Sequence, residues 1–318
     1  MSPTDSETTR RIVYSGEPLI LRAFLKGRLH LSTRSLKRLK YREDGLRVNG
    51  ETVTVRRVLN DGDVVELDLR EEEEQEGAVT PVDLPLEIIW QDSCVTVCDK
   101  PPHMPTHPVH DHILDTAANA LAYDYLRRTG RSDYVFRTAY RLDANTSGLI
   151  VAANDFVSSG SFFRQVSSRT VEKTYLAITK GVPPHKGPEY TVIDRPIARR
   201  DDRNAMRTVD EGGVRAVTAY RVLAVSDARD MALLAVRTLT GRTHQIRVHM
   251  AYAGCPLLGD FLYGEETPLI SRHALHACRV AFDRPADGRR MVFVSPIPGD
   301  MTRVLRDHFA DYSNNTEF

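Results

Sequence analysis

A run of acidic residues near residue 75 divides this 318-residue chain into two parts of opposite charge. Residues 10–57 carry 13 Lys and Arg against 4 Asp and Glu, whereas residues 61–87 carry 11 acidic residues and a single base, Arg70. A charge run that leads into Gly and Pro is typical of a solvated segment between folded units. We therefore expect an acidic linker over residues 71–84, with an exposed loop inside one domain as the alternative.

The chain as a whole has the composition of an ordinary globular protein, with 41% hydrophobic and 27% charged residues. Its formal net charge is zero, so total charge predicts no nucleic-acid binding and hides the basic N-terminal block. No apolar run reaches the roughly 18 residues that span a membrane. The N-terminus lacks the apolar stretch of a secretory signal, so we expect a cytoplasmic protein with no membrane partner. Buried, reduced thiols are expected at Cys94, Cys98, Cys255 and Cys278.

The basic N-terminal block has the pattern of a small α+β module. Two short helices are expected within residues 18–41, the second with Ser32 or Thr33 as its N-cap. A hairpin that turns at Asn49-Gly50 follows them. A merely solvated helix more often mixes both signs of charge, so the second helix is expected to face RNA phosphates. Its basic side chains are Arg34, Lys37, Arg38 and Lys40.

The remainder of the chain alternates β-rich runs with amphipathic helices, which predicts a mixed, mainly antiparallel α+β domain. One helix is expected to begin after Thr116 and to stop at Gly130. Another is expected to have Thr243 as its N-cap and to stop at Gly254. The sequence holds no phosphate-binding loop and no nucleophile elbow, which argues against nucleotide hydrolysis, dinucleotide binding and serine hydrolase chemistry.

Four histidines lie within ten residues and raise the question of a metal site. Pro105 and Pro108 break any single face of this segment, and no cysteine is near it. We therefore expect a loop that borders a polar cleft, without metal ligands. The histidines are His103, His107, His110 and His112.

The segment TAYRLDANTSGLIVAAND, residues 138–155, places Arg141 and Asp143 directly before an apolar run. An ionised carboxylate that enters a hydrophobic element is costly unless it is paired or used. Asp143 could cap a turn, form half of an ion pair or take part in chemistry. Tyr175 and Arg247 are equally ambiguous alone, since strand aromatics and surface charges are common.

Several segments together resemble the RluA-type pseudouridine synthases. The family's R-L-D-x-x-T-S-G-L motif resembles YRLDANTSGLIVAAND, its K-x-Y strand resembles VEKTYLAITKG, and its G-R-T-H-Q-I-R-x-H block resembles GRTHQIRVHMAYAGCP. Three further pieces occur in the family's order: DKPPHMPTHP, RAVTAYRVL and RHALHACRVAF. The resemblance covers about residues 85–295. The N-terminal block in turn resembles the S-four-type RNA-binding domain, through STRSLKRLK, VNGETV and LNDGDVVEL.

This resemblance implies a catalytic domain with a curved, mainly antiparallel sheet and a central cleft. It implies Asp143 as the catalytic aspartate, Tyr175 as a stacking surface for the target base and Arg247 as the partner of Asp143. Arg141 would help to expel the base from its stack. The family usually has His at the position of Tyr140 and Gly at that of His103. Substrate contacts are expected from Arg141, Lys173, Thr146, Arg242, His244, Gln245 and His107.

The implied activity is the isomerisation of specific uridines in structured RNA by base flipping, with ribosomal RNA favoured and transfer RNA as the alternative. The reaction involves no redox change and no external group, so neither a cofactor nor a metal is expected. A monomer is expected. The implied organisation is a disordered tail over residues 1–13, an RNA-binding domain over 14–70, the linker over 71–84, the catalytic domain over 85–310 and a flexible tail over 311–318.

Two other functions would use the same segments. A catalytically silent RNA-binding protein is one, although it has no physical need to keep a carboxylate at the position of Asp143. A hydrolytic N-glycosidase is the other, and it would use the same carboxylate but release free uracil.

Overall fold

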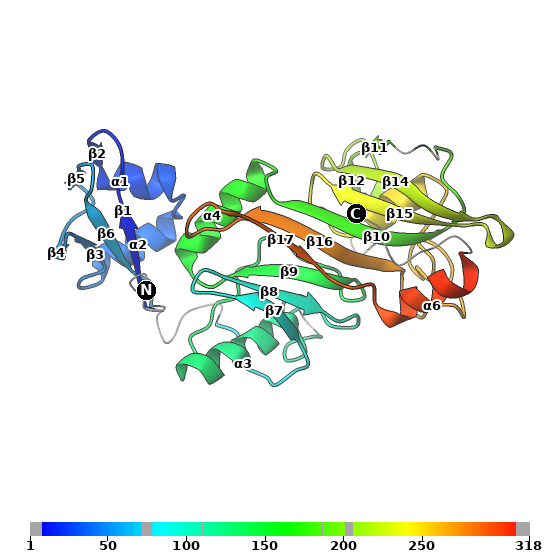
Figure 1. Ribbon diagram of the computed structural model, residues 1–318, viewed down its shortest axis with the longest axis horizontal. Helices are drawn as coiled ribbons and strands as arrows, with labels where there is room; N and C mark the ends of the chain where they lie inside the picture. Colours follow the sequence, from blue (N-terminus) through cyan, green and yellow to red (C-terminus); the bar gives the residue numbers. More distant parts are fainter. Residues whose placement is uncertain are drawn as a thin grey trace.

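The computed structural model of the protein describes residues 8–70, 78–109, 111–185, 187, 189–200 and 206–309. Within these residues a small N-terminal module lies beside a large domain that is built on an extended sheet (Figure 1). The two parts have separate hydrophobic cores.

The N-terminal module packs short helices against a four-stranded sheet in the order β1-β6-β3-β4. Leu21, Leu39 and Val65 are among its buried core residues. Ser32 caps the second helix, as expected, because its hydroxyl accepts a hydrogen bond from the Ser35 N–H at 3.0 Å. The elements are β1 (Thr9–Val13), β2 (Leu19–Ile20), α1 (Leu21–Ala23) with the π-helical turn Phe24–Arg28, α2 (Thr33–Tyr41), β3 (Leu46–Val48), β4 (Glu51–Thr52), β5 (Val58–Leu59) and β6 (Val64–Asp68).

The first strand corrects the tail that was expected over residues 1–13. Strand β1 pairs antiparallel with β6, from Thr9 opposite Asp68 to Val13 opposite Val64. Its sequence, TRRIV, has only two apolar residues at its end, so the hydrophobic pattern gave no strand signal. The N-terminal folded module therefore begins before residue 14, where the expected domain was to start.

The large domain is built on a nine-stranded mixed sheet in the order β11-β14-β15-β10-β16-β9-β8-β7, with β17 paired to β16. Neighbouring strands are antiparallel except for β9 and β16, which run parallel. The expected mixed, mainly antiparallel α+β fold is confirmed. The strands are β7 (Glu87–Gln91), β8 (Val95–Lys100), β9 (Ser147–Ala153), β10 (Glu172–Lys180), β11 (Thr191–Asp194), β14 (Val217–Ser226), β15 (Met231–Thr238), β16 (Leu275–Asp283) and β17 (Arg290–Val294), beside a separate pair, β12 (Ile197–Arg199) and β13 (Arg207–Val209).

Two helices of the large domain test the expected helix ends. Thr116 caps one helix within a capping box, and Gly130 ends it in the left-handed conformation, as expected. The expected N-cap Thr243 is wrong: the helix begins after His244, which gives no side-chain cap. The Thr243 hydroxyl instead accepts a hydrogen bond from Arg141 Nη2 at 3.0 Å. The helices are α3 (Ala117–Thr129), α4 (Phe156–Ser167), α5 (Gln245–Tyr252) and α6 (Gly299–His308).

Strand β9 is buried along its whole length and anchors the segment that carries Asp143. Its second residue, Gly148, has φ +113 and lies opposite Ala277 of β16. A Cβ at Gly148 would lie 2.4 Å from the Ala277 carbonyl oxygen. Only glycine therefore lets the two strands approach closely enough to pair at this point.

The N-terminal module is fixed to the large domain at the start of α4. Arg10 Nη2 donates to Asp155 Oδ2 at 2.8 Å, and both side chains are buried. Asp155 also caps α4 by accepting hydrogen bonds from two backbone N–H groups of its first turn. The Arg38 guanidinium lies 4.1 Å from the centre of the Phe156 ring, and Phe156 and Val157 pack into the core of the module. The contact is thus part ionic and part hydrophobic.

Part of the expected linker belongs to the large domain. Ala78 forms a β-bridge with Val135, and the Val79 N–H donates to the Tyr134 carbonyl at 3.1 Å. The linker expectation over 71–84 is therefore wrong from Ala78 on, because backbone pairing fixes this stretch. Outside the described residues lie 71–77 and the tail expected over 311–318.

The four cysteines are free and buried, as expected. Burial raises the pKa of Cys255 to about 11, so it is a thiol at neutral pH. Across the part of the chain that the structure describes, no helix is long and apolar enough to cross a membrane.

Candidate active site

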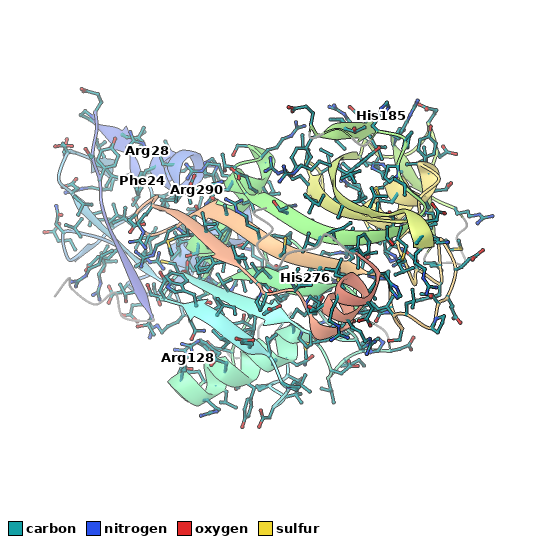
Figure 2. The ribbon with its side chains drawn as sticks, turned by 45° about the vertical axis from the view of Figure 1, so that its right-hand side comes forward. Phe24, Arg28, Arg128, His185, His276 and Arg290 are labelled. Carbon is teal, nitrogen blue, oxygen red and sulfur yellow. The ribbon has the colours of Figure 1, made fainter. Side chains whose placement is uncertain are left out.

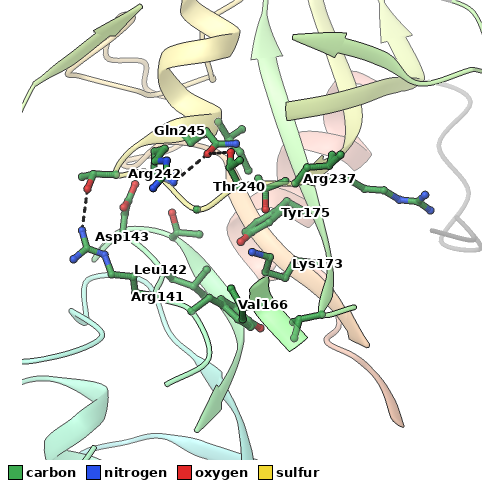
Figure 3. A pocket seen from close by; sticks show the side chains of 18 of the residues that line it. Arg141, Leu142, Asp143, Val166, Lys173, Tyr175, Arg237, Thr240, Arg242 and Gln245 are labelled. Carbon is green, nitrogen blue, oxygen red and sulfur yellow. Dashed lines mark hydrogen bonds between the residues drawn. The ribbon is translucent and has the colours of Figure 1, made fainter. Parts of the chain in front are cut away.

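A cavity of about 510 Å³ opens between the segment before β9, the segment before α5 and the start of β10. Side chains from these three parts point into the same space (Figure 3). Asp143, Tyr175 and Arg247 all line it. His107 does not, and it lies near Arg141 instead. The other six expected substrate contacts line the cavity, namely Arg141, Thr146, Lys173, Arg242, His244 and Gln245.

Two buried basic side chains hold the backbone that directly follows Asp143. Lys100, at the end of β8, donates through Nζ to the Ala144 carbonyl at 2.9 Å and to two further carbonyls. Arg272 Nη1 donates to the Asn145 carbonyl at 3.1 Å. Arg272 is itself fixed by two hydrogen bonds, of 2.6 and 2.9 Å, to a carboxylate of α6. The position of Asp143 therefore depends on β8 and on the last helix of the chain.

Lys100 lies where its charge is disfavoured. It is fully buried, and burial together with the positive charge of Arg272 lowers the pKa of Lys100 to about 7. Its three carbonyl acceptors offset part of the cost of desolvating the ammonium group. A buried lysine in this position is a structural tie, since its amino group faces backbone oxygens.

Two buried histidines fix the turn from another side. The Thr146 hydroxyl and His273 Nε2 lie 2.8 Å apart, and the Ser147 hydroxyl and His276 Nδ1 lie 3.0 Å apart. His276 lies on the central sheet (Figure 2). Burial lowers the pKa of His273 to about 3 and that of His276 to about 4, so both rings are neutral at pH 7. Thr146 thus lines the cavity while its hydroxyl helps to hold the turn.

Arg247 has Asp260 as its main partner and also forms the expected ion pair with Asp143, which is looser. Its Nε and Nη2 each donate to the Asp260 carboxylate at 2.8 Å, whereas its Nη1 lies 3.6 Å from Asp143 Oδ2. Although burial alone would raise the pKa of Asp260, the hydrogen bonds and charge of Arg247 lower it. The floor of the cavity is thus a fixed, buried ion pair, and Asp143 lies at its edge.

His244 lies on another side of Asp143. Its Nε2 is 4.0 Å from Asp143 Oδ2, and its Nδ1 is hydrogen-bonded to the Tyr263 hydroxyl at 2.9 Å. That hydroxyl also accepts from the Arg207 N–H at 2.8 Å, and the Tyr263 ring centre lies 5.0 Å from the Arg247 guanidinium carbon. Burial lowers the pKa of His244, so its ring is neutral at pH 7.

Tyr175 gives the cavity an aromatic wall. It lies on β10 where the register with β16 shifts, and burial raises the pKa of its hydroxyl, which keeps it protonated at neutral pH. Lys173 precedes it by two residues and so faces the same side of the strand. The Lys173 ammonium lies 5.2 Å from the centre of the Tyr140 ring, and burial lowers the pKa of Lys173 to about 8.

The segment before α5 is shaped by Gln245. Its carbonyl oxygen accepts from the Thr240 hydroxyl at 2.7 Å and from the Arg242 N–H at 3.0 Å, and its amide donates to two groups of β14. Its hydrogen-bonding capacity is therefore filled by the protein, which makes it a positioning residue and not the expected substrate contact. Arg141 is exposed and bridges to this segment through Thr243.

The lining of the cavity is positive. Two carboxylates line it, Asp143 and Glu172, and Glu172 is engaged by Arg279 at 3.5 Å and by Arg290. Asp143 is therefore the carboxylate available at the centre of the site. The six basic residues in the lining are Arg141, Arg169, Lys173, Arg237, Arg242 and Arg247.

The histidine-rich segment does not form a metal site in the part of the chain that is described. No group of three or more His, Cys, Asp or Glu side chains among the described residues is arranged to hold a metal ion. His110 lies outside the described residues. The same segment does support the site, because Thr106 Oγ1 donates to the Leu142 carbonyl at 2.7 Å.

Comparison with known proteins identifies the large domain. Residues 95–252 match the family model described as RNA pseudouridylate synthase. The uncharacterized RNA pseudouridine synthase YjbO of Bacillus subtilis is 35% identical over 281 residues, which cover 88% of this chain and 96% of that protein. The chain belongs to the RluA-type pseudouridine synthases.

Other members of the family agree with this assignment. Ribosomal large subunit pseudouridine synthase D of Pseudomonas aeruginosa is 37% identical over 281 residues, covering 83% of this chain and 84% of that protein. The solved structure of human RNA Pseudouridylate Synthase Domain Containing 4 has a TM-score of 0.55 at 25% identity, and covers 69% of this chain and 92% of that chain. The fold and the enzyme class are thus those of an RNA pseudouridine synthase.

The structure accounts for the two positions where this pseudouridine synthase departs from the family motifs. His103 has φ +63, the left-handed conformation that glycine adopts most readily, so its position is one that suits the glycine usual in the family. Tyr140, in place of the usual His, donates its hydroxyl hydrogen to the Leu149 carbonyl at 2.8 Å. Tyr140 thereby ties the Asp143 segment to β9.

Sequence reasoning missed the residues that hold this pseudouridine synthase site together. Asp260 follows a glycine in PLLGDFLYG and looks like a turn residue. Lys100 precedes a proline at a strand end, where a lysine is usually solvated. Arg272 and His273 had no signal beyond the motif in which they lie. Most of these contacts join segments that meet only in the folded chain, such as Lys100 with Ala144 and Arg272 with Asn145.

Proposed function

We propose that this enzyme converts specific uridines of large-subunit ribosomal RNA to pseudouridine, with Asp143 as the catalytic carboxylate. The observation that carries the proposal is the position of Asp143. Its side chain is 23% exposed in a positively lined cavity, 3.6 Å from Arg247 Nη1 and 4.0 Å from His244 Nε2. The name of the Pseudomonas aeruginosa relative supports the choice of ribosomal RNA.

The substrate uridine would enter the cavity only after it leaves its stack in the RNA. A volume of about 510 Å³ lies within the range of about 300–1,000 Å³ that is usual for small-molecule sites. The Tyr175 ring offers a flat surface for the uracil, and exposed Arg141 lies at the mouth, where it can occupy the place of the flipped base. Arg242, also exposed, would contact phosphate.

The reaction breaks the bond between uracil N1 and ribose C1′ and forms a bond between uracil C5 and C1′. The C5 proton is released, and N1 gains a proton. An ionised Asp143 can act as the nucleophile at the sugar or base, or it can accept a proton beside the ribose. Both routes place the carboxylate next to the ribose, where Arg247 supplies a fixed positive charge.

The departing uracil carries negative charge, which the basic lining would stabilise. Lys173 lies beside Tyr175, and its pKa of about 8 leaves it mainly protonated at pH 7. Its ammonium group is therefore suited to this role. Neither route needs a cofactor, because the same atoms are joined in a new order.

The N-terminal module would bind RNA through α2. Arg34, Lys37 and Arg38 lie on this helix together with Lys40, and they give it an excess of positive charge. Such a helix attracts the phosphate backbone without reading its sequence. The proposed RNA-binding domain would start at β1 and the catalytic domain before β7.

One labelling experiment tests the proposed reaction. Ribosomal RNA that carries tritium at uridine C5 should release tritium to water in proportion to pseudouridine formed, because the C5–H bond is broken. An N-glycosidase would instead release labelled uracil, and a silent binding protein would release neither. Pseudouridine mapping of total RNA with and without the enzyme then identifies the site, and a site found only in transfer RNA would overturn the proposed substrate.

A further inference from the structure

A second cavity lies between the two parts of the protein. Its volume is about 980 Å³, and it is bounded by α2 of the N-terminal module and by α4 and residues 135–137 of the catalytic domain. Among the described residues, its lining holds no Asp or Glu. We call this cavity the seam groove. Its basic residues are Lys26, Arg34, Lys37, Arg38, Arg42 and Arg137.

The two walls of the seam groove are held together by direct contacts. In addition to the Arg10–Asp155 ion pair, Gly160 of α4 packs against the backbone of the module. A Cβ at Gly160 would lie 2.6 Å from the Leu29 carbonyl oxygen, so only glycine fits there. The seam groove is therefore a feature of the docked protein, to which each part contributes one wall.

Helix α4 connects the seam groove to the active site. Phe163 lines the seam groove and is 72% exposed, whereas Val166 lines the catalytic cavity and is 41% exposed. Residues three apart lie on one face of a helix, separated by about 4.5 Å along its axis. The two cavities thus meet across one turn of α4, over an exposed apolar ridge made of these two side chains.

We propose that a single-stranded segment of the substrate RNA runs from the catalytic cavity, over the Phe163–Val166 ridge, into the seam groove. This inference rests on the proposed function, which makes RNA the substrate. The described lining is basic and holds no Asp or Glu, which matches a phosphate backbone, and Arg42 also pairs with Asp68 outside the lining at 3.2 Å. Two exposed aromatic rings border this path, Phe163 and Tyr41, and Tyr41 is 76% exposed. Such rings can stack on unpaired bases, and a duplex offers no unpaired bases.

Two exposed basic residues of the module separate this proposal from general attraction by a basic surface. Lys37 lines the seam groove, whereas Arg56, between β4 and β5, does not. Both side chains are exposed. Reversal of either charge changes the net charge of the protein equally, so unequal effects report on the seam groove itself.

The test measures binding of a fluorescent oligouridylate to the full-length protein by anisotropy at several salt concentrations. Lys37→Glu should weaken binding about tenfold and reduce the salt slope by about one, against about threefold or less for Arg56→Glu. Phe163→Ala should weaken binding about tenfold, and Phe163→Trp, which keeps an aromatic face, should bind like the wild type. The exposure of Phe163 allows these changes without loss of core packing, which thermal unfolding verifies.

Activity on ribosomal RNA provides an independent readout. Phe163→Ala should raise KM and leave kcat close to that of the wild type, because the residue would hold RNA away from the reacting atoms. Equal binding by the wild type, Lys37→Glu and Phe163→Ala would overturn the seam groove while leaving pseudouridine formation intact. If polyglutamate displaced the oligouridylate as well as unlabelled RNA does, the seam groove would bind an acidic protein instead of RNA. If the wild type formed no pseudouridine, the proposed function itself would be overturned.

Discussion

The division of roles between the two carboxylates near Arg247 can be tested by replacing each with asparagine. Asp260 is fully buried and accepts two hydrogen bonds of 2.8 Å from Arg247, whereas Asp143 is partly exposed and lies 3.6 Å from it. Removal of one partner from a buried ion pair costs about 3–5 kcal/mol. Loss of a partly exposed, loosely paired charge costs about 0–1 kcal/mol.

We therefore expect Asp260→Asn to lower the free energy of unfolding by about 3–5 kcal/mol and Asp143→Asn by less than about 1 kcal/mol. At about 2–4 °C per kcal/mol, the Asp260→Asn variant should unfold about 6–20 °C below the wild type. Urea unfolding followed by circular dichroism measures the free energies, and thermal scans measure the shift. Activity should show the reverse contrast, with Asp143→Asn inactive although it is stable.

A double-mutant cycle isolates the pair. Arg247→Met combined with Asp260→Leu removes both buried charges, so it should cost less than the two single changes add up to, by about 2 kcal/mol or more. The same cycle between Arg247→Met and Asp143→Asn should couple by less than about 1 kcal/mol. If Asp143→Asn destabilises the protein as much as Asp260→Asn, the assignment of Asp260 as the main partner of Arg247 is wrong.

Three further predictions concern the supports of the Asp143 segment. Lys100→Met leaves one buried and two partly buried carbonyls without their donor, so we expect a loss of about 3 kcal/mol in unfolding free energy and at least tenfold lower activity in the tritium assay. Wild-type values of both quantities would contradict the structural role of Lys100. Buried His273 and His276 have pKa values below that of an unfolded histidine, so the unfolded state binds more protons and stability falls as pH drops below 6.5. Each histidine should lower the free energy of unfolding by about 2 kcal/mol between pH 7 and pH 5. Urea unfolding of His273→Gln at these two pH values should show a loss that is smaller by the contribution of His273. Gly148→Ala would place a Cβ against the Ala277 backbone, so we expect a loss of about 3 kcal/mol, whereas Gly50→Ala at an open turn should cost less.

Local signals in the sequence were sufficient for part of the fold and of the site. The caps at Ser32 and Thr116 and the stop at Gly130 depend only on neighbouring residues, and the structure confirms them. The R-L-D and K-x-Y segments identified two walls of the cavity. Their resemblance to a known family indicated the roles of Asp143 and Tyr175, which hydrophobic periodicity alone did not indicate.

Contacts between distant residues could not be predicted. Asp260 and Arg247 are only thirteen residues apart, but nothing in the sequence shows that the turn folds back under α5. The parallel pairing of Gly148 with Ala277 joins segments about 130 residues apart. Arg10 fell in an expected tail because strand β1 has little apolar pattern, yet its ion pair with Asp155 helps to dock the module.

The most direct test of the central claim is the activity of Asp143→Asn on the RNA site found by mapping. Single-turnover release of tritium from C5-labelled RNA should be undetectable for this variant, while its binding of RNA and its unfolding free energy remain close to those of the wild type. Asparagine keeps the size of the side chain but carries no charge and cannot act as a nucleophile or base at neutral pH. Pseudouridine formation by Asp143→Asn at a rate within about tenfold of the wild type would contradict the assignment of Asp143 as the catalytic residue.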